Sequence, residues 1–305
     1  MNFRYFLSAL VGLLALAAST ARAVDVTDDL GRVTHWSAPP QRIVAMVPSL
    51  TESVCELGAC SRLVGVDRYS NYPASVNALP KLGGMFDTNV EMIAALRPDV
   101  VLVAPSSRVA ERLQALGLQV VVLDAKTYQD VQRVLDKLGQ LLAVPDAPRV
   151  WRRIEAGVGA AAQSLPASVR GTSVYYEVAS GPYAAGEISF MGEVMSRLGA
   201  RNIIPASMGP FPKINPEYVV RANPDVIMMG QRDAAGVVTR PGWQRITAVR
   251  EKRICVFTRE EGDMLVRPGP RLAEAAQIMA RCLRDTAAQS NTATGNTATG
   301  NKAAR

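Results

Sequence analysis

The chain has 305 residues, of which 48% are hydrophobic and 20% charged, with a formal net charge of +7. It is too apolar and too weakly charged to be disordered, and it is long enough for two domains. Because His35 is the only histidine, multi-histidine zinc sites are excluded, and Ser-His-Asp or Cys-His catalysis would depend on that one residue.

Residues 1–23 have the pattern of a cleavable secretory signal. Arg4 provides the positive start, the segment from Phe6 to Ala18 is apolar, and Ala21-Arg22-Ala23 is an A-x-A cleavage site. The apolar run is shorter than the roughly 20 residues that a membrane span needs. Since no cysteine lies near the cleavage site, we expect a periplasmic protein that is not lipid-anchored.

Apolar segments of strand length alternate with helical patterns along the rest of the chain. The predicted strands are 42–48, 63–66, 100–103 and 119–123 in the first half, and 173–178, 226–229 and 254–257 in the second. This alternation predicts parallel sheets. Two helices lie between the halves, an amphipathic one at 128–142 and another from Pro148 to about 164. Tyr175 and Tyr176 point to opposite faces of one strand, so only one is expected to face the core.

Export changes the interpretation of the four cysteines, because an oxidising compartment permits disulfides. Cys55 and Cys60 are close in sequence, and Cys255 and Cys282 fall in the last predicted strand and helix. These two pairs are the preferred set among three possible sets. Four buried free thiols remain the alternative, since spacing alone does not determine connectivity.

The two halves share a detailed signature that indicates internal duplication. The segment 89–103 aligns without a gap on the segment 215–229, and Asn, Glu, Pro, Asp and Val coincide. The two asparagines suit helix N-caps, which places Glu91 and Glu217 in the first turn. There the helix dipole favours a carboxylate by roughly 0.3–1 kcal/mol. The alternative to this capping role is a pair of exposed carboxylates that bind a two-fold symmetric partner.

The C-terminal residues and the scattered basic residues carry little functional information. Residues 287–305 contain a repeated five-residue unit of small polar residues, and we expect a flexible, low-complexity tail without packed structure. Lys and Arg are mixed with acidic residues and form no block, and an exported protein rarely meets nucleic acid. We therefore expect no nucleic-acid partner.

Short motifs in both halves resemble the helical-backbone class of periplasmic substrate-binding proteins. These are the receptors of ABC importers for vitamin B12, haem and iron–siderophores. The motifs are Arg42-Ile-Val, Thr51-Glu52, Tyr69-Ser-Asn-Tyr-Pro73, Gly83-Gly84, Asn89-x-Glu91 and Leu96-Arg-Pro-Asp99, then Phe190-Met-Gly192, Gly199-Ala-Arg-Asn202, Glu217 and Pro224-Asp225. Together the motifs cover residues 41–285, which is nearly the whole mature chain.

The resemblance implies an α/β fold of two Rossmann-like lobes with central, mostly parallel sheets, joined by a single long backbone helix. After the signal at 1–23, the N-lobe would occupy 24–145, the helix 146–168 and the C-lobe 169–286, followed by the tail. It also implies a monomeric receptor for a permease dimer and its ATPase, with Glu91 and Glu217 docking on permease arginines. No catalytic residue, metal site or resident cofactor is expected.

Within the class, the sequence is most similar to vitamin B12 receptors, which implies a corrinoid ligand. The resemblance places ligand contacts at Tyr69, Met85, Phe86, Phe211, Asp263 and Arg267. The sequence departs from those receptors at Ala104 and Ile204, where they have aromatic residues. Haem and a ferric siderophore are therefore the alternatives. Since His35 precedes the region that carries the motifs, 41–285, and is expected to lie far from the cleft, only tyrosines remain as haem ligands.

The residue types agree in part with a ligand cleft. Open α/β sheets bind ligands beyond the carboxyl ends of their strands, where several of these aromatic residues fall. Flat aromatic side chains suit the apolar edge of a corrin, and an Asp–Arg pair suits its amides or phosphate. The alternatives are half-buried loop anchors for the aromatics, and a surface ion pair worth about 0–1 kcal/mol for Asp263 and Arg267.

Two other classes of protein are alternatives to an import receptor. Chelatases have related lobes, but the sequence has no metal-ligand spacing, nucleophile elbow or phosphate loop. An adaptor for a signalling protein would share the fold, and its gene would not neighbour those of a permease and an ATPase.

Overall fold

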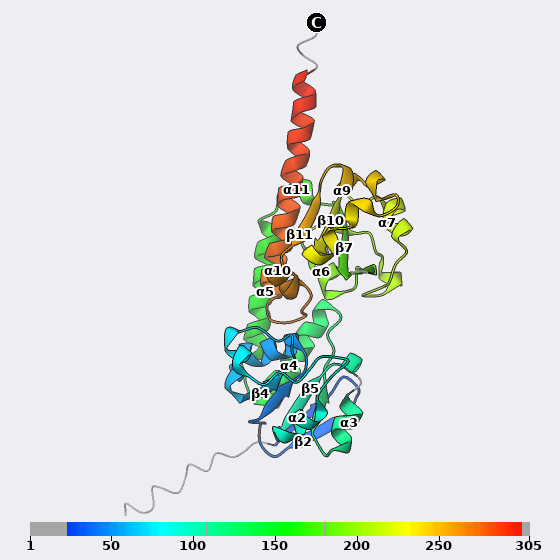
Figure 1. The fold of residues 1–305 in the computed structure, drawn as a ribbon. Coiled ribbons are helices and arrows are strands. Elements are labelled where there is room, and N and C mark those ends of the chain that lie inside the picture. The colour runs from blue at the N-terminus through cyan, green and yellow to red at the C-terminus, as the bar shows by residue number, and fades with distance from the viewer. Residues whose placement is uncertain (1–22, 108, 180, 301–305) are drawn as a thin grey trace, which may run out of the picture.

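The computed structural model describes residues 23–107, 109–179 and 181–300, which form two α/β lobes (Figure 1). All but the last residue of the expected signal, 1–23, lies outside the described residues. The first strand, β1, begins at Val24, directly after the expected cleavage site. In the described ranges, no helix is long and apolar enough to cross a membrane.

The N-lobe is built on a parallel sheet with strand order β4-β3-β5-β6. The strands are β3 Ile43–Ala45, β4 Leu63–Val66, β5 Val100–Val103 and β6 Val120–Val122. An antiparallel hairpin of β1 Val24–Thr27 and β2 Val33–Trp36 precedes them, and β1 packs along α4 (Tyr128–Leu142).

Helices cover both faces of this sheet, which is why its strands are continuous apolar runs. Val100 and Leu102 of β5 belong to the hydrophobic cluster that includes α1 (Pro48–Glu56) and α4. The alternate residues Val101 and Val103 belong to the cluster that includes α2 (Val90–Ala95) and α3 (Ala110–Ala115).

The C-lobe repeats this plan around β7, which pairs in parallel with β10, which in turn pairs in parallel with β11. On its other side β7 pairs with β8 in antiparallel and with β9 in parallel orientation. The strands are β7 Ser173–Ala179, β8 Tyr183–Ala184, β9 Arg201–Asn202, β10 Val226–Gly230 and β11 Ile254–Phe257. The helices are α6 Phe190–Arg197, α7 Pro216–Ala222, α8 Gln231–Ala234, α9 Thr247–Arg250, α10 Arg259–Leu265 and α11 Leu272–Gly300.

The expectation that only one of Tyr175 and Tyr176 faces the core is wrong. Both side chains are buried, because each face of the C-lobe sheet has its own hydrophobic cluster. Tyr175 packs with Trp243 at a ring distance of 5.9 Å, and Tyr176 packs with Phe257 on the opposite face, also at 5.9 Å.

Helix α5 (Ala147–Gln163) lies where the backbone helix between the lobes was expected. It runs beside α11 along one side of the molecule (Figure 1). The two helices approach closely at Gly157, where an added Cβ would lie only 2.5 Å from the Cβ of Ala273. With its two lobes, parallel sheets and long connecting helix, the structure confirms the expected fold class.

Both preferred disulfides are present. Cys55–Cys60 joins the end of α1 to the turn that follows it, and Cys255–Cys282 joins β11 to α11. All four cysteines are therefore paired, and the alternative of free thiols does not apply. The second disulfide attaches the C-terminal helix to the edge strand of the C-lobe sheet.

The C-terminal segment differs from the expectation of a tail without packed structure. Helix α11 continues to Gly300, and its last turns extend away from the C-lobe (Figure 1). Ala287 is half-buried against the hydrophobic core, so packing reaches past the expected boundary. Once a helix is formed, each further residue adds a backbone hydrogen bond, so the packed turns before Leu283 can extend into the polar repeat. Residues 301–305 lie outside the described part.

Candidate functional site

The carboxyl ends of the C-lobe strands border a cavity of 590 Å³. Glu177 and Val178 lie at the end of β7, Gly230 ends β10, Thr258 follows β11, and Asp263 lies on α10. This is the edge at which open α/β sheets bind ligands, and the volume is typical of small-molecule sites. The cavity is therefore the candidate site of the C-lobe.

Glu177, which lines this cavity, is the buried partner of an ion pair with Arg240. Glu177 is buried, and its carboxylate accepts hydrogen bonds from Arg240 at 2.6 and 2.8 Å and from the hydroxyl of Tyr175 at 3.1 Å. Burial and the neighbouring carboxylate raise the pKa of Tyr175, and the hydrogen bond with Glu177 raises the pKa of Arg240. The negative charge of the Glu177 carboxylate is thus compensated by the positive charge of Arg240.

Arg232 and Arg259 also line the cavity and are exposed. Sequence reasoning named Arg232 as a contact for an anionic siderophore, and it did not select Glu177 or Arg259. Glu177 carried a usable signal, because it is an acidic residue inside the apolar strand predicted at 173–178.

Tyr69, Met85 and Phe86 lie on two neighbouring loops of the N-lobe and are exposed. Their side chains are 60%, 47% and 95% exposed. The loops that carry them are tied by an ion pair of Arg68 with Asp87, and an added Cβ on Gly84 would lie 3.1 Å from the Tyr69 ring. Exposed apolar clusters of this kind mark binding surfaces.

Phe211 differs from the other predicted aromatic contacts. It is half-buried, packs against the hydrophobic core, and lies 5.9 Å from the ring of Phe190. This is the packing of a loop anchor, the alternative considered for the aromatic residues.

Asp263 and Arg267 form an ion pair at 3.1 Å, but it is not a surface pair. Arg267 is only 6% exposed, and it also donates to Glu52 at 2.7 Å and to Asn71 at 2.8 Å, both in the N-lobe. Asp263 lines the cavity, whereas Arg267 does not. Sequence reasoning missed this use of Glu52, which is the acidic residue in the otherwise uncharged first half of α1.

The duplicated helices start as expected. The side chain of Asn89 accepts a hydrogen bond from the amide of Met92, and that of Asn215 accepts one from the amide of Glu217, each at 2.9 Å. Glu91 lies on α2 of the N-lobe and Glu217 on α7 of the C-lobe (Figure 1). Both glutamates are exposed, and neither forms an ion pair among the described residues.

Residues 43–260 match the profile of a family described as periplasmic binding protein. The chain belongs to this family. Family members of this type are substrate-binding proteins of ABC transporters, which are not enzymes. The transport class inferred from the motifs is thereby confirmed.

Individual relatives differ in the ligand for which they are named. The chain is 28% identical to the vitamin B12-binding protein of Pectobacterium atrosepticum over 249 residues, covering 79% of this chain and 87% of the relative. It is 29% identical over 256 residues to an uncharacterized ABC transporter substrate-binding lipoprotein, YvrC of Bacillus subtilis, covering 80% of each. A periplasmic haem-binding protein from Pseudomonas aeruginosa superposes with a TM-score of 0.67 and 27% identity, over 81% of this chain and 93% of that one.

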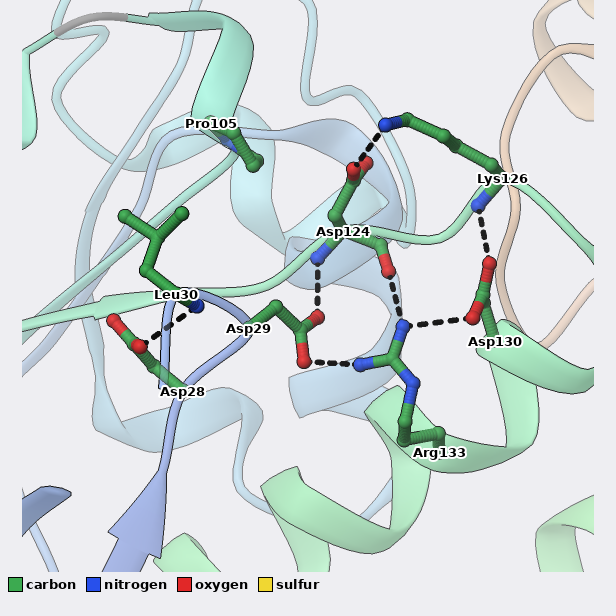
Figure 2. Close-up of a pocket in the computed structure, with 8 residues that line it drawn as sticks. All are labelled: Asp28, Asp29, Leu30, Pro105, Asp124, Lys126, Asp130 and Arg133. Carbon is green, nitrogen blue, oxygen red and sulfur yellow. Dashed lines mark hydrogen bonds and ion pairs between the residues drawn. The ribbon is translucent and has the colours of Figure 1, made fainter. Parts of the chain in front are cut away.

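A second cavity, of 610 Å³, lies in the N-lobe of this binding protein (Figure 2). Its lining consists mostly of charged residues, namely Asp28, Asp29, Leu30, Pro105, Asp124, Lys126, Asp130 and Arg133. Figure 2 shows that these groups already pair with one another. Arg133 bridges Asp29 and Asp130, and Lys126 pairs with Asp124 at 2.9 Å. The network therefore joins the β1–β2 turn to the start of α4.

Asp130 provides a test of this network by pH. Partial burial acts to raise its pKa, but hydrogen bonds from Arg133 and from the amides of Thr127 and Lys126 outweigh burial and hold the pKa at about 2. A carboxyl with a depressed pKa stabilises the fold above its unfolded value near 3.8, and the stabilisation is lost as pH falls toward 2. Asp130→Asn should therefore lower the free energy of unfolding by about 2 kcal/mol at pH 7 and by almost nothing at pH 2.

Urea unfolding measured from pH 2 to 7 checks this expectation. Asp136→Asn on the same helix is the matched control, because partial burial raises the pKa of Asp136, and its loss should not destabilise the protein at pH 7. A pH-independent difference between wild type and Asp130→Asn would contradict the network.

Proposed function

We propose that this protein captures a corrinoid, cobalamin or a close relative, in the cleft between its lobes and delivers it to an ABC permease. The observation that carries the proposal is the surface of Tyr69, Met85 and Phe86, which offers exposed apolar area on the N-lobe. The C-lobe contributes the polar cavity with Asp263. A corrin has an apolar ring edge and a rim of amides, and these two surfaces match the two chemistries. The similarity to a vitamin B12-binding protein supports the same ligand.

Haem is the second candidate ligand, supported by the similarity to a haem-binding protein of Pseudomonas aeruginosa. His35 is not the expected iron ligand, because it lies on β2 in the hairpin that precedes the N-lobe sheet and does not line the cavity at the C-lobe strand ends. The exposed Tyr69 and Tyr72 would have to serve instead. A ferric siderophore is the third candidate, for which Arg68 and Arg232 would meet anionic groups.

The mode of action that we propose is stoichiometric binding by a monomer, with no resident cofactor and no catalytic step. The permease dimer and its ATPase would be the partners, and Glu91 and Glu217 would dock on permease arginines. We also propose that the protein is periplasmic, without a lipid anchor.

Calorimetric titration with cyanocobalamin, cobinamide and haemin tests the ligand. We expect both corrinoids to bind. Tyr69→Ala and Phe86→Ala should each weaken cyanocobalamin binding by about tenfold or more, because each removes apolar area worth roughly 1.5–3 kcal/mol when buried. Leu116→Ala, an exposed apolar residue at the end of α3, is the matched control and should have no effect. Tight haemin binding without any corrinoid binding would replace the proposal by its second candidate.

Docking is tested by removing both exposed glutamates. Glu91→Ala combined with Glu217→Ala should abolish ligand uptake by cells and leave the affinity of the purified protein unchanged. Glu111→Ala is the matched control, because Glu111 is also an exposed first-turn acid of an N-lobe helix. Normal uptake by the double variant would refute the docking role.

Export is tested by the mass of the mature N-terminus. Cleavage after Ala23 would leave Val24, the first residue of β1, as the N-terminal residue. Intact-mass measurement of the protein isolated from the producing cell should therefore give residues 24–305 without added lipid. A lipid-modified N-terminus, such as the name of the relative YvrC indicates for that protein, would contradict this expectation.

A further inference from the structure

A short segment of the C-lobe between α10 and α11, residues 266–271, contacts the N-lobe. Helix α10 lies at the junction of the two lobes (Figure 1). Gly269 packs on the start of α1, since an added Cβ would lie 3.4 Å from the carbonyl oxygen of Ser49. Arg267 and Arg271 of this segment both bind N-lobe groups, and Glu52 lies between them.

The guanidinium of Arg267 is buried and surrounded by hydrogen-bond acceptors of the protein. It donates to Glu52 at 2.7 Å, to the Asn71 side chain at 2.8 Å and to the carbonyl oxygen of Tyr69 at 3.1 Å. Its side chain is 7% exposed and that of Glu52 is 1% exposed. Groups buried to this extent reach no ligand unless the structure rearranges. A buried charge is tolerated only with such partners. Without Arg267, Glu52 would keep only Arg271 at 3.9 Å as a cationic partner, whereas without the charge of Glu52, Arg267 would keep Asp263 at 3.1 Å.

Arg271 holds the same N-lobe loop at a second point. Its guanidinium lies 4.0 Å from the centre of the Tyr72 ring, a cation–π contact, and 3.9 Å from Glu52. A third point is the Asn71 side chain, which donates to Asp263 of α10 at 3.0 Å. Residues 69–72, which present two exposed tyrosines, are therefore held from the opposite lobe at three places.

From these contacts we infer that Glu52, Arg267 and Arg271 form an interlobe clamp that positions the loop 69–72 before any ligand arrives. Arg267 is then a positioning residue, and it acts on the ligand through Tyr69. Because the loop is already ordered, binding does not have to order it, and pre-organisation of this kind increases affinity. The inference rests on the proposed function, because it explains how one wall of the proposed ligand cleft is held in place.

A double-mutant cycle distinguishes positioning from direct contact. Its variants are Glu52→Gln, Arg267→Met and the two combined, and the combined variant keeps the fold testable because it buries no unpaired charge. If the clamp positions the loop, each single variant weakens cyanocobalamin binding about tenfold, and the double variant also about tenfold and not hundredfold. Arg284→Met, an exposed arginine of α11 outside the cavity lining, is the matched control and leaves the clamp and the cavity intact.

Hydrogen exchange of residues 67–76 in the ligand-free protein is the second readout. Glu52→Gln should speed exchange of this segment about tenfold relative to wild type, because a clamp acts without ligand, and Arg284→Met should not. Unchanged exchange and affinity in Glu52→Gln, with lost binding in Arg267→Met, would make Arg267 a direct ligand contact and overturn the inference. If wild type binds no corrinoid, the proposed function fails, and the exchange result alone still decides for or against the clamp.

Discussion

One hydrophobic cluster runs from the sheet of the N-lobe to the sheet of the C-lobe. It joins Ile43 and Leu102 of the first sheet, through Trp151 of α5, to Tyr176 and Met228 of the second. A core shared in this way resists large relative motion, because opening it would expose close-packed apolar surface. The geometry of the cleft therefore depends on this continuous core, and wide hinge closure is disfavoured.

Polar contacts between the two lobes restrain their relative orientation in addition to the shared hydrophobic core. On one side, the amide of Phe190 donates to the carbonyl of Lys126 at 2.7 Å, and Glu193 accepts from the amide of Tyr128. On another side, Arg267 pairs with Glu52. Because these contacts belong to different helices, the lobes are fixed against rotation as well as separation. A small adjustment of loops is then the motion that the structure permits on ligand entry.

The pattern of apolar and polar residues predicts the strands and helices better than it predicts which of their side chains are buried. Strands such as Val100–Val103 and Ile254–Phe257 were placed correctly, because continuous apolar runs next to turn residues leave few alternatives. The burial of both Tyr175 and Tyr176 was missed, because a strand seen alone does not reveal that helices cover both of its faces. The continuation of helix α11 beyond residue 287 was also missed. The prediction relied on the small, polar composition of this segment and did not consider that a helix packed further upstream can extend into it.

For the candidate site too, local sequence indicates some features, and others depend on how the two lobes assemble. Tyr69 and Phe86 were chosen as ligand contacts from loop positions next to strand ends, which are visible in the sequence, and both are exposed. Their contact with a ligand stays a prediction. Arg267 was chosen as a ligand contact, yet its partner Glu52 lies 215 residues earlier in the chain, and no local pattern links the two. Burial of a charge is a property of the assembled lobes, so spacing alone gives a surface ion pair as the default interpretation.

The duplication of the lobes accounts for which parts are alike and which are not. The capped helices at Asn89 and Asn215 are equivalent, and each presents an exposed glutamate. The surfaces at the cleft are different, with an apolar loop surface in the N-lobe and the charged cavity around Glu177 in the C-lobe. A two-fold symmetric partner needs equivalent docking residues on both lobes. A ligand with one apolar and one polar side needs a different surface on each lobe. Equivalent glutamates together with different surfaces at the cleft are what the proposed division between permease and ligand requires.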